Sequence, residues 1–242
     1  MGLLDYPENL NFMSMMKGFF KETSSLKLLS LACSLMTILI GMIVLLGWFI
    51  HSPFLIQIHP SFVPMQFNTA LGFGVIGSAF LCFIFGREKL SKSFSVVAMI
   101  IGGLTLIEYI LSVNLGIDEL FMKHYIDTET SNPGRMAPNT ALCFLLSGVT
   151  ILLSQMVNRN REAFLATMSS VIFALGFAAF SGYVFGIDTA YGWGNLTKMA
   201  LHTSTGFVIL SIGMLLLAFS AHDLKASLPR WTPWPICIAG LT

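Results

Sequence analysis

The line VPMQFNTALGF at residues 63–73 recurs, with changes, as GRMAPNTALCF at residues 134–144 and TKMALHTSTGF at residues 197–207. In each copy a Met stands three positions before an Asn or His, a Thr follows directly, and a Phe lies four residues beyond the Thr. Self-similarity at a long spacing is typical of a fold built from repeated units. The three copies therefore guide the fold prediction.

The composition is that of a polytopic membrane protein. Of 242 residues, 55% are hydrophobic and 10% are charged, and the mean hydropathy is +0.78, whereas soluble domains carry roughly 25% charged residues. The net charge of +1 gives no indication of nucleic-acid binding. The Cys residues lie in apolar runs without CxxC spacing, which favours packing roles over disulfides or zinc: Cys33, Cys82, Cys143 and Cys237.

Six runs are apolar for about the 20 residues that a helix needs to cross a bilayer. They cover residues 28–50, 68–86, 94–113, 139–157, 164–185 and 202–221, and the start of a seventh is expected at Pro235. Ten Lys and Arg residues lie on one side of these spans and three on the other: Lys123, Arg135 and Lys198. The positive-inside rule therefore places the N-terminus and the segment after residue 221 on the cytoplasmic side of the membrane.

The odd-numbered spans share a second pattern, in which a Gly is followed by five residues and then by a pair ending in an aromatic residue. The pairs are Gly47-Trp48, Glu108-Tyr109 and Gly182-Tyr183, after Gly41, Gly102 and Gly176. We predict an all-α membrane protein whose six transmembrane helices form three tandem pseudo-equivalent hairpins. The repeats cover about residues 28–90, 91–160 and 161–221, between a cytoplasmic segment 1–27 and a connector 222–242. Parallel repeats imply a pseudo-rotation axis along the membrane normal.

Threefold pseudo-symmetry would bring the three motifs together at the outer ends of the even-numbered spans. If each helix already includes its Met, the spacing of three puts Met and Asn or His on one face. Three sets of side chains then become candidate ligand-binding residues: Met65, Met136 and Met199; Asn68, Asn139 and His202; Thr69, Thr140 and Thr203. A structural interpretation stays open, in which the glycines only permit close helix approach and the Asn residues only cap helices.

Glu108 is the only acidic residue inside a predicted span. Ionisable groups at such depth are costly and are functional candidates. Its counterparts are Gly47 and Gly182, so the repeated scaffold does not require a carboxylate. We expect His202 as its partner, while solvation at the interface or a bond to a nearby Tyr or Trp remains the alternative.

A metal or haem is a further alternative. Met thioethers with an imidazole suit Cu(I), and haem needs axial His or Met ligands. The residues available for either are His202, Met65, Met136 and Met199. The sequence has no Walker loop, GxSxG or HExxH motif, so an enzyme is not expected.

The motifs PMQFNTAL, PGRMAPNTAL and MALHTSTGF, with LIEYILSVNLGIDELF and GYVFGIDTAYGWGNLT, resemble the multi-spanning N-terminal regions of bacterial sensor histidine kinases and diguanylate cyclases. The resemblance covers roughly residues 28–235. It implies a membrane-embedded sensor that precedes a cytoplasmic signalling domain, and a homodimer. It also implies roles for the motif residues, for Glu108, and for the loop residues Asp118 and Asp188.

These observations predict a signal-input module that binds a small ligand in an outward-facing site among the three motifs. A small-solute transporter or channel is the rival prediction, because internal repeats and polar residues within spans also fit that class.

Overall fold

The computed structural model describes residues 25–126, 132–156, 160–194, 196–220 and 231–240. The predicted N-terminal segment up to residue 24 and the connector from 222 to 230 lie outside these residues. Across the described ranges every regular element is a helix. The fold class predicted from composition is thus confirmed as helical.

Five helices are long and apolar enough to cross a membrane. They are α2 (Ser25–Phe49), α4 (Phe67–Ile84), α5 (Glu88–Leu111), α7 (Arg161–Phe185) and α9 (Leu201–Ser220). A sixth apolar helix, α6 (Pro138–Ser154), has 17 residues. The bounds agree with the apolar runs, except that α5 begins six residues before its predicted start at residue 94. The chain is therefore a multi-pass membrane protein.

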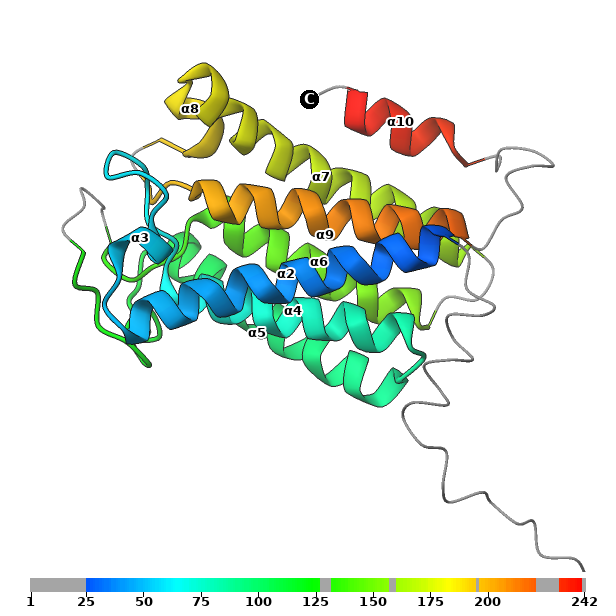
Figure 1. Ribbon diagram of the computed structural model, residues 1–242, viewed down its shortest axis with the longest axis horizontal. Coiled ribbons are helices and arrows are strands. Elements are labelled where there is room, and N and C mark those ends of the chain that lie inside the picture. The colour runs from blue at the N-terminus through cyan, green and yellow to red at the C-terminus, as the bar shows by residue number, and fades with distance from the viewer. Residues whose placement is uncertain (1–24, 127–131, 157–159, 195, 221–230, 241–242) are drawn as a thin grey trace, which may run out of the picture.

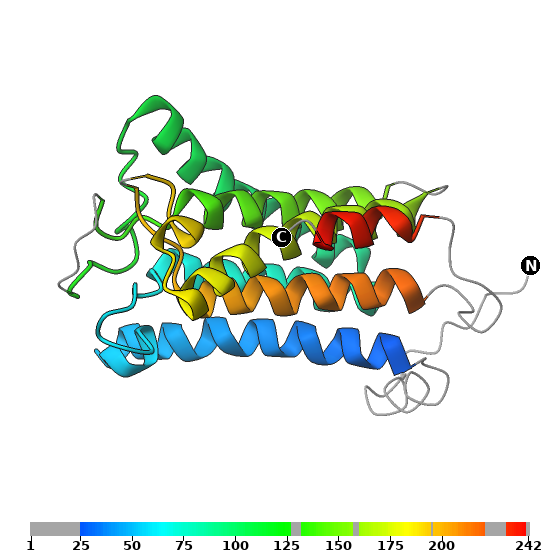
Figure 2. The ribbon, with the colours of Figure 1, turned by 90° about the horizontal axis from the view of Figure 1, so that it is seen from above.

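Three short helices complete the described structure. They are α3 (Pro53–Ile56), α8 (Asp188–Tyr191) and α10 (Pro233–Gly240). The first two lie with the long loop after α5 at one end of the bundle, here termed the outer end (Figures 1 and 2). Helix α10 packs against α7 and contains Pro235, where a further span was predicted to start.

The helices α2, α5 and α7 end in the same way at the outer end. Each is followed by a residue in the left-handed region, and the next N–H returns to a carbonyl five residues back, as in a Schellman cap. The left-handed residues are His51, Ser112 and Gly186, with φ of 56°, 52° and 67°. The returning bonds are Ser52 N to Gly47 O at 2.9 Å, Val113 N to Glu108 O at 3.1 Å, and Ile187 N to Gly182 O at 2.8 Å.

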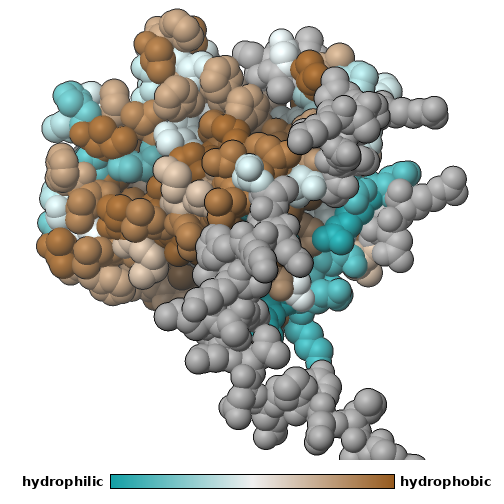
Figure 3. Space-filling view, turned by 45° about the vertical axis from the view of Figure 1, so that its right-hand side comes forward, coloured by the Kyte–Doolittle hydropathy of each residue, from teal (hydrophilic) through white to brown (hydrophobic). Residues whose placement is uncertain are grey.

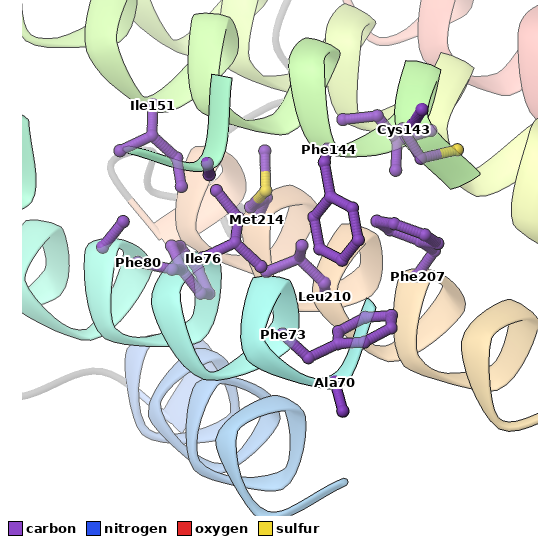
Figure 4. Close-up of a cluster of buried hydrophobic side chains, with 14 of the residues drawn as sticks. Ala70, Phe73, Ile76, Phe80, Cys143, Phe144, Ile151, Phe207, Leu210 and Met214 are labelled. Atoms are coloured by element: carbon purple, nitrogen blue, oxygen red, sulfur yellow. The ribbon is translucent and has the colours of Figure 1, made fainter. Parts of the chain in front are cut away.

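The core of the bundle lies between α4, α6 and α9. One Phe from each helix points to the centre, and the ring centroids are 5.1, 4.8 and 4.9 Å apart, typical of packed aromatic pairs: Phe73, Phe144 and Phe207. Figure 4 shows these rings with Ile76, Leu210 and Met214 beside them. The three helices therefore form an inner group whose centre is filled by side chains.

Each remaining long helix packs against two members of this inner group. Helix α2 contacts α4 and α9, α5 contacts α4 and α6, and α7 contacts α6 and α9. One glycine on each of α2, α5 and α7, here termed the outer helices because they surround the inner group, permits the approach. A Cβ on Gly41 would lie 2.6 Å from Ala70 O, one on Gly102 would lie 2.4 Å from Ala141 O, and one on Gly176 would lie 3.3 Å from Ser204 O. These contacts support the packing interpretation of the glycine pattern.

The outward faces of the long helices are apolar. Leu39 is 56% exposed and Ile110 is 77% exposed, and hydrophobic side chains cover much of the bundle surface in Figure 3. Large contiguous apolar surfaces are rare on soluble monomers. A lipid environment accounts for this one.

Candidate functional site

The outer end is held together by three matched hydrogen bonds. In each, an aromatic side chain near the end of an outer helix donates to the main-chain carbonyl of a motif Met. The pairs are Trp48 Nε1 with Met65 at 2.9 Å, Tyr109 Oη with Met136 at 2.9 Å, and Tyr183 Oη with Met199 at 2.8 Å. The Met backbone is thus the anchor of each motif.

The condition for aligning each motif Met with its Asn or His, that the helix includes the Met, does not hold. Helices α4, α6 and α9 begin two residues after Met65, Met136 and Met199, respectively. The first N-cap, Gln66, is extended and makes no side-chain capping bond. Because the Met residues precede the helices, the helical spacing rule does not align them with Asn or His. Their side chains are buried.

The Thr residues, rather than the Asn residues, share the helix face of the central Phe rings. Each motif Thr lies four residues before its Phe, and side chains at this spacing occupy one face of a helix. All three are at most 2% exposed: Thr69, Thr140 and Thr203. The Phe triangle therefore has a layer of hydroxyl side chains on its outer side.

The Asn and His residues have unequal surroundings. Asn139 is buried, and its Nδ2 lies 3.4 Å from the carbonyl of Tyr191, on α8. Oδ1 of Asn68 and Nδ1 of His202 are buried atoms without a hydrogen-bond partner. The predicted Asn caps are not of the usual kind, because Asn68 and Asn139 are the second residues of their helices and not the N-caps.

The expected partnership of Glu108 with His202 is also wrong. Glu108 is fully buried, and its Oε1 lies 3.4 Å from Nη2 of Arg135 and accepts a 2.8 Å hydrogen bond from the N–H of Leu115. A buried carboxylate requires a cation or several donors, and Arg135 supplies the cation. Nδ1 of His202 has no partner.

Arg135 is the residue that the sequence prediction missed. It was counted only as an outer-side cation, although it immediately precedes Met136. The sequence held a signal, because Glu108 directly precedes Tyr109 and Arg135 directly precedes Met136 in the same repeat. In the structure the ring of Tyr109 lies 5.3 Å from the guanidinium carbon of Arg135. An intramembrane carboxylate beside an aromatic anchor points to a cation beside the anchored Met.

Asp118, in the loop after α5, and Asp188, at the start of α8, each form an ion pair that is here termed a clamp. Each pairs at 2.7 Å with the basic residue directly before a motif Met: Asp118 with Arg135, and Asp188 with Lys198. Gly134 makes the first clamp possible, since it has φ of +77° and a Cβ there would lie 2.8 Å from Cγ of Glu119. Both clamps tie an outer loop to the start of an inner helix.

The exposed clamp has a simple electrostatic signature. Hydrogen bonds from Lys198 and Tyr191 lower the pKa of Asp188 below its ordinary value. Burial, followed by the bond to Asp188, raises the pKa of Tyr191 to about 12. Asp188 therefore stays ionised, and Tyr191 stays protonated, at neutral pH.

Within the described residues, His, Cys, Asp and Glu do not gather in groups of three or more that could hold a metal ion. The Met-based copper alternative relies on other ligands and stays a prediction. Comparisons with protein-family models, with curated proteins and with solved structures find no match to this chain.

Proposed function

We propose that the chain is the signal-input module of a bacterial inner-membrane receptor, and that it binds a small ligand at the outer ends of α4, α6 and α9. One observation carries the proposal. Oδ1 of Asn68 and Nδ1 of His202 stand at matched motif positions, and both are buried without a partner. Such atoms cost about 1–3 kcal/mol each, so they mark places where a ligand or a water completes the bonding.

The scaffold of this module is six transmembrane helices in three pseudo-equivalent hairpins, with the N-terminus in the cytoplasm. Three recurrences support it: the aromatic bonds to the Met carbonyls, the left-handed caps, and the glycine contacts with the inner helices. The 17 residues of α6 are within the range that spans a bilayer.

The chemistry of the motifs favours a small uncharged ligand. Their side chains offer amide, hydroxyl, imidazole and thioether groups, and the neighbouring Arg135 and Lys198 are engaged with carboxylates. The replacement of Asn by His in one copy favours an asymmetric occupant. Asn68 Oδ1 accepts a hydrogen bond, whereas His202 Nδ1 can donate or accept one.

Signalling follows from the position of these residues between hairpins. Asn139 of the second hairpin reaches Tyr191 of the third, so a ligand that bonds at the equivalent positions changes how neighbouring hairpins fit together. A ligand shifts such an equilibrium only if it prefers one arrangement. The shift passes through the segment after α9 to a kinase or cyclase output domain of a homodimeric receptor, and this module itself is not an enzyme.

The rival as a channel has weaker support. The Phe73, Phe144 and Phe207 rings lie about one ring width apart across the centre of the inner helices. A solute path along that centre would require all three rings to move. A visible absorption spectrum with metal analysis of the purified protein distinguishes a haem or copper protein from the proposed sensor.

The test of the proposal is the output of the full-length receptor during exposure to a library of small uncharged compounds. A compound that changes kinase or cyclase output in the wild type should have a much weaker effect on Asn68→Ala and His202→Ala, while basal output persists. Ile110 is 77% exposed on the lipid-facing surface, so the Ile110→Ala variant should respond like the wild type. An unchanged response in both site variants contradicts the assignment.

A further inference from the structure

The end of α5 and the loop between α5 and α6 contain a buried charge cluster that the proposed ligand site does not use. Nε of Arg135 lies 2.7 Å from Oδ2 of Asp118, and Nη2 lies 3.4 Å from Oε1 of Glu108. The side chains of Arg135, Asp118 and Glu108 are 5%, 8% and 0% exposed. All three ionisable groups are thus removed from bulk water.

The charges of this cluster do not balance. Two carboxylates share one guanidinium, so the fully ionised cluster carries one net negative charge. An uncompensated buried charge is strongly destabilising. Each carboxylate also keeps one buried oxygen without a hydrogen-bond partner, namely Oε2 of Glu108 and Oδ1 of Asp118. The cluster therefore lacks one positive charge and one hydrogen-bond donor.

Within the described residues, Arg135 is the only basic side chain that pairs with either carboxylate, and Lys123 of the same loop is exposed. The ring of Tyr109 lies beneath Arg135, and Glu119 accepts the N–H of His124, whose ring is directed to Gln66. The first turns of α4 and α6 contain no titratable side chain. The main chain contributes the N–H of Leu115 to Glu108 and the carbonyl of Val113 to Arg135.

The other two copies of the motif manage without such a cluster. Gly47 and Gly182 stand where the second copy has Glu108, and Pro64 stands where it has Arg135. In the third copy Lys198 and Asp188 pair at a solvent-exposed site. Since the scaffold folds the other two outer ends without buried charges, the cluster of the second copy has a purpose beyond packing.

We propose that Glu108, Asp118 and Arg135 form a buried proton-binding site at the outer end, which holds the loop 113–126 against the start of α6. Proton uptake converts one carboxylate into a carboxylic acid and brings the formal charge of the cluster to zero. The new O–H supplies the missing donor. Loss of this proton leaves the buried negative charge and loosens the loop, so the site makes the outer end sensitive to pH.

Infrared difference spectroscopy of the whole chain in lipid tests this proposal. Exposed carboxyl groups have pKa values below about 5 and are ionised at neutral pH. The wild type should therefore show one band from a protonated carboxyl group near neutral pH, and this band should disappear as the pH rises. Glu108→Gln and Asp118→Asn should each lose the band. Asp188→Asn, which alters the exposed clamp, should retain it. ¹³C-carboxyl labelling of Glu or Asp in the wild type checks the assignment without any substitution.

Thermal unfolding gives a second readout. The folded cluster binds a proton that the unfolded chain has released at neutral pH. The unfolding temperature of the wild type should therefore decrease as the pH is raised from about 6 to about 9. Glu108→Gln carries no ionisable group at this position and should fall less. Absence of the band from the wild type, its persistence in both cluster variants, or a midpoint that depends on Na⁺ or K⁺ instead of pH would overturn the proposal.

Discussion

The indole Nε1 of Trp48 donates a 2.9 Å hydrogen bond to the main-chain carbonyl of Met65. This bond ties the end of α2 to the residue that precedes the N-cap of α4. Tyr109 and Tyr183 make the same bond at matched positions. The main shared feature of the three motifs is thus a hydrogen bond to the main chain of the Met, and the motif side chains are arranged around that bond.

Removal of one anchor hydroxyl should destabilise the outer end. In Tyr109→Phe the carbonyl of Met136 loses its donor, which costs about 1–3 kcal/mol for a buried group. Denaturant unfolding in detergent measures the loss. Tyr125→Phe is the matched control, because its hydroxyl is 3.4 Å from the carbonyls of Gly47 and Trp48 and makes weaker bonds. Equal losses in the two variants would contradict the anchor role.

Two adjacent glycines should respond differently to the same substitution. A Cβ at Gly102 would lie 2.4 Å from Ala141 O and 2.9 Å from Leu145 N, whereas one at Gly103 meets nothing within 4 Å. We expect Gly102→Ala to cost about 1–3 kcal/mol through overpacking. Gly103→Ala should be neutral or gain up to about 1 kcal/mol of helix propensity. Comparable thermal midpoints would argue against close packing of α5 on α6.

Without ligand, the native Asn68 should make the protein less stable than an apolar residue at this position would. Asn68→Leu removes a buried oxygen that has no partner, so it should raise stability by up to about 1–3 kcal/mol and abolish ligand binding. Asn139→Leu is the control, since it removes an amide that contacts Tyr191 O and the N–H of Thr140. Its unfolding midpoint should fall. A fall in both variants would indicate that Asn68 has a structural role.

The exposed clamp should contribute stability only above acid pH. Because the pKa of Asp188 is lowered in the folded protein, its contribution is present above about pH 4, the ordinary range for Asp, and is lost as the pH falls through the folded value. The difference in midpoint between wild type and Asp188→Asn should therefore shrink in acid and vanish once Asp188 is protonated in the folded protein. Lys198→Gln should remove the same dependence. A difference that persists in acid would have another origin.

The helical membrane class and the helix bounds could be predicted because they depend on apolar run length, which is local. The Schellman ends at His51, Ser112 and Gly186 could not be read from residue type, since only one of the three is glycine. The hairpin arrangement stays a prediction that the recurring contacts support. Its basis in the sequence was the matched spacing around Gly41, Gly102 and Gly176.

The candidate site was predicted less well. The alignment of Met with Asn or His depended on each helix including its Met, but the helices begin two residues after Met65, Met136 and Met199. Glu108 was identified from its cost in a span, and its partner was chosen wrongly. Arg135 lies 27 residues away across a loop, and the anchoring of Met136 by Tyr109 together with the ion pair to Asp118 brings it to the carboxylate.

The central claim is that the motif residues at the outer end form one ligand site. Isothermal titration of the purified chain, with a compound that alters receptor output, tests this claim most directly. Saturable binding to the wild type and to Ile110→Ala is expected, with at least about a tenfold loss in His202→Ala, as removal of one hydrogen bond of about 1.4 kcal/mol predicts. Equal affinity in wild type, Asn68→Ala and His202→Ala would contradict the account.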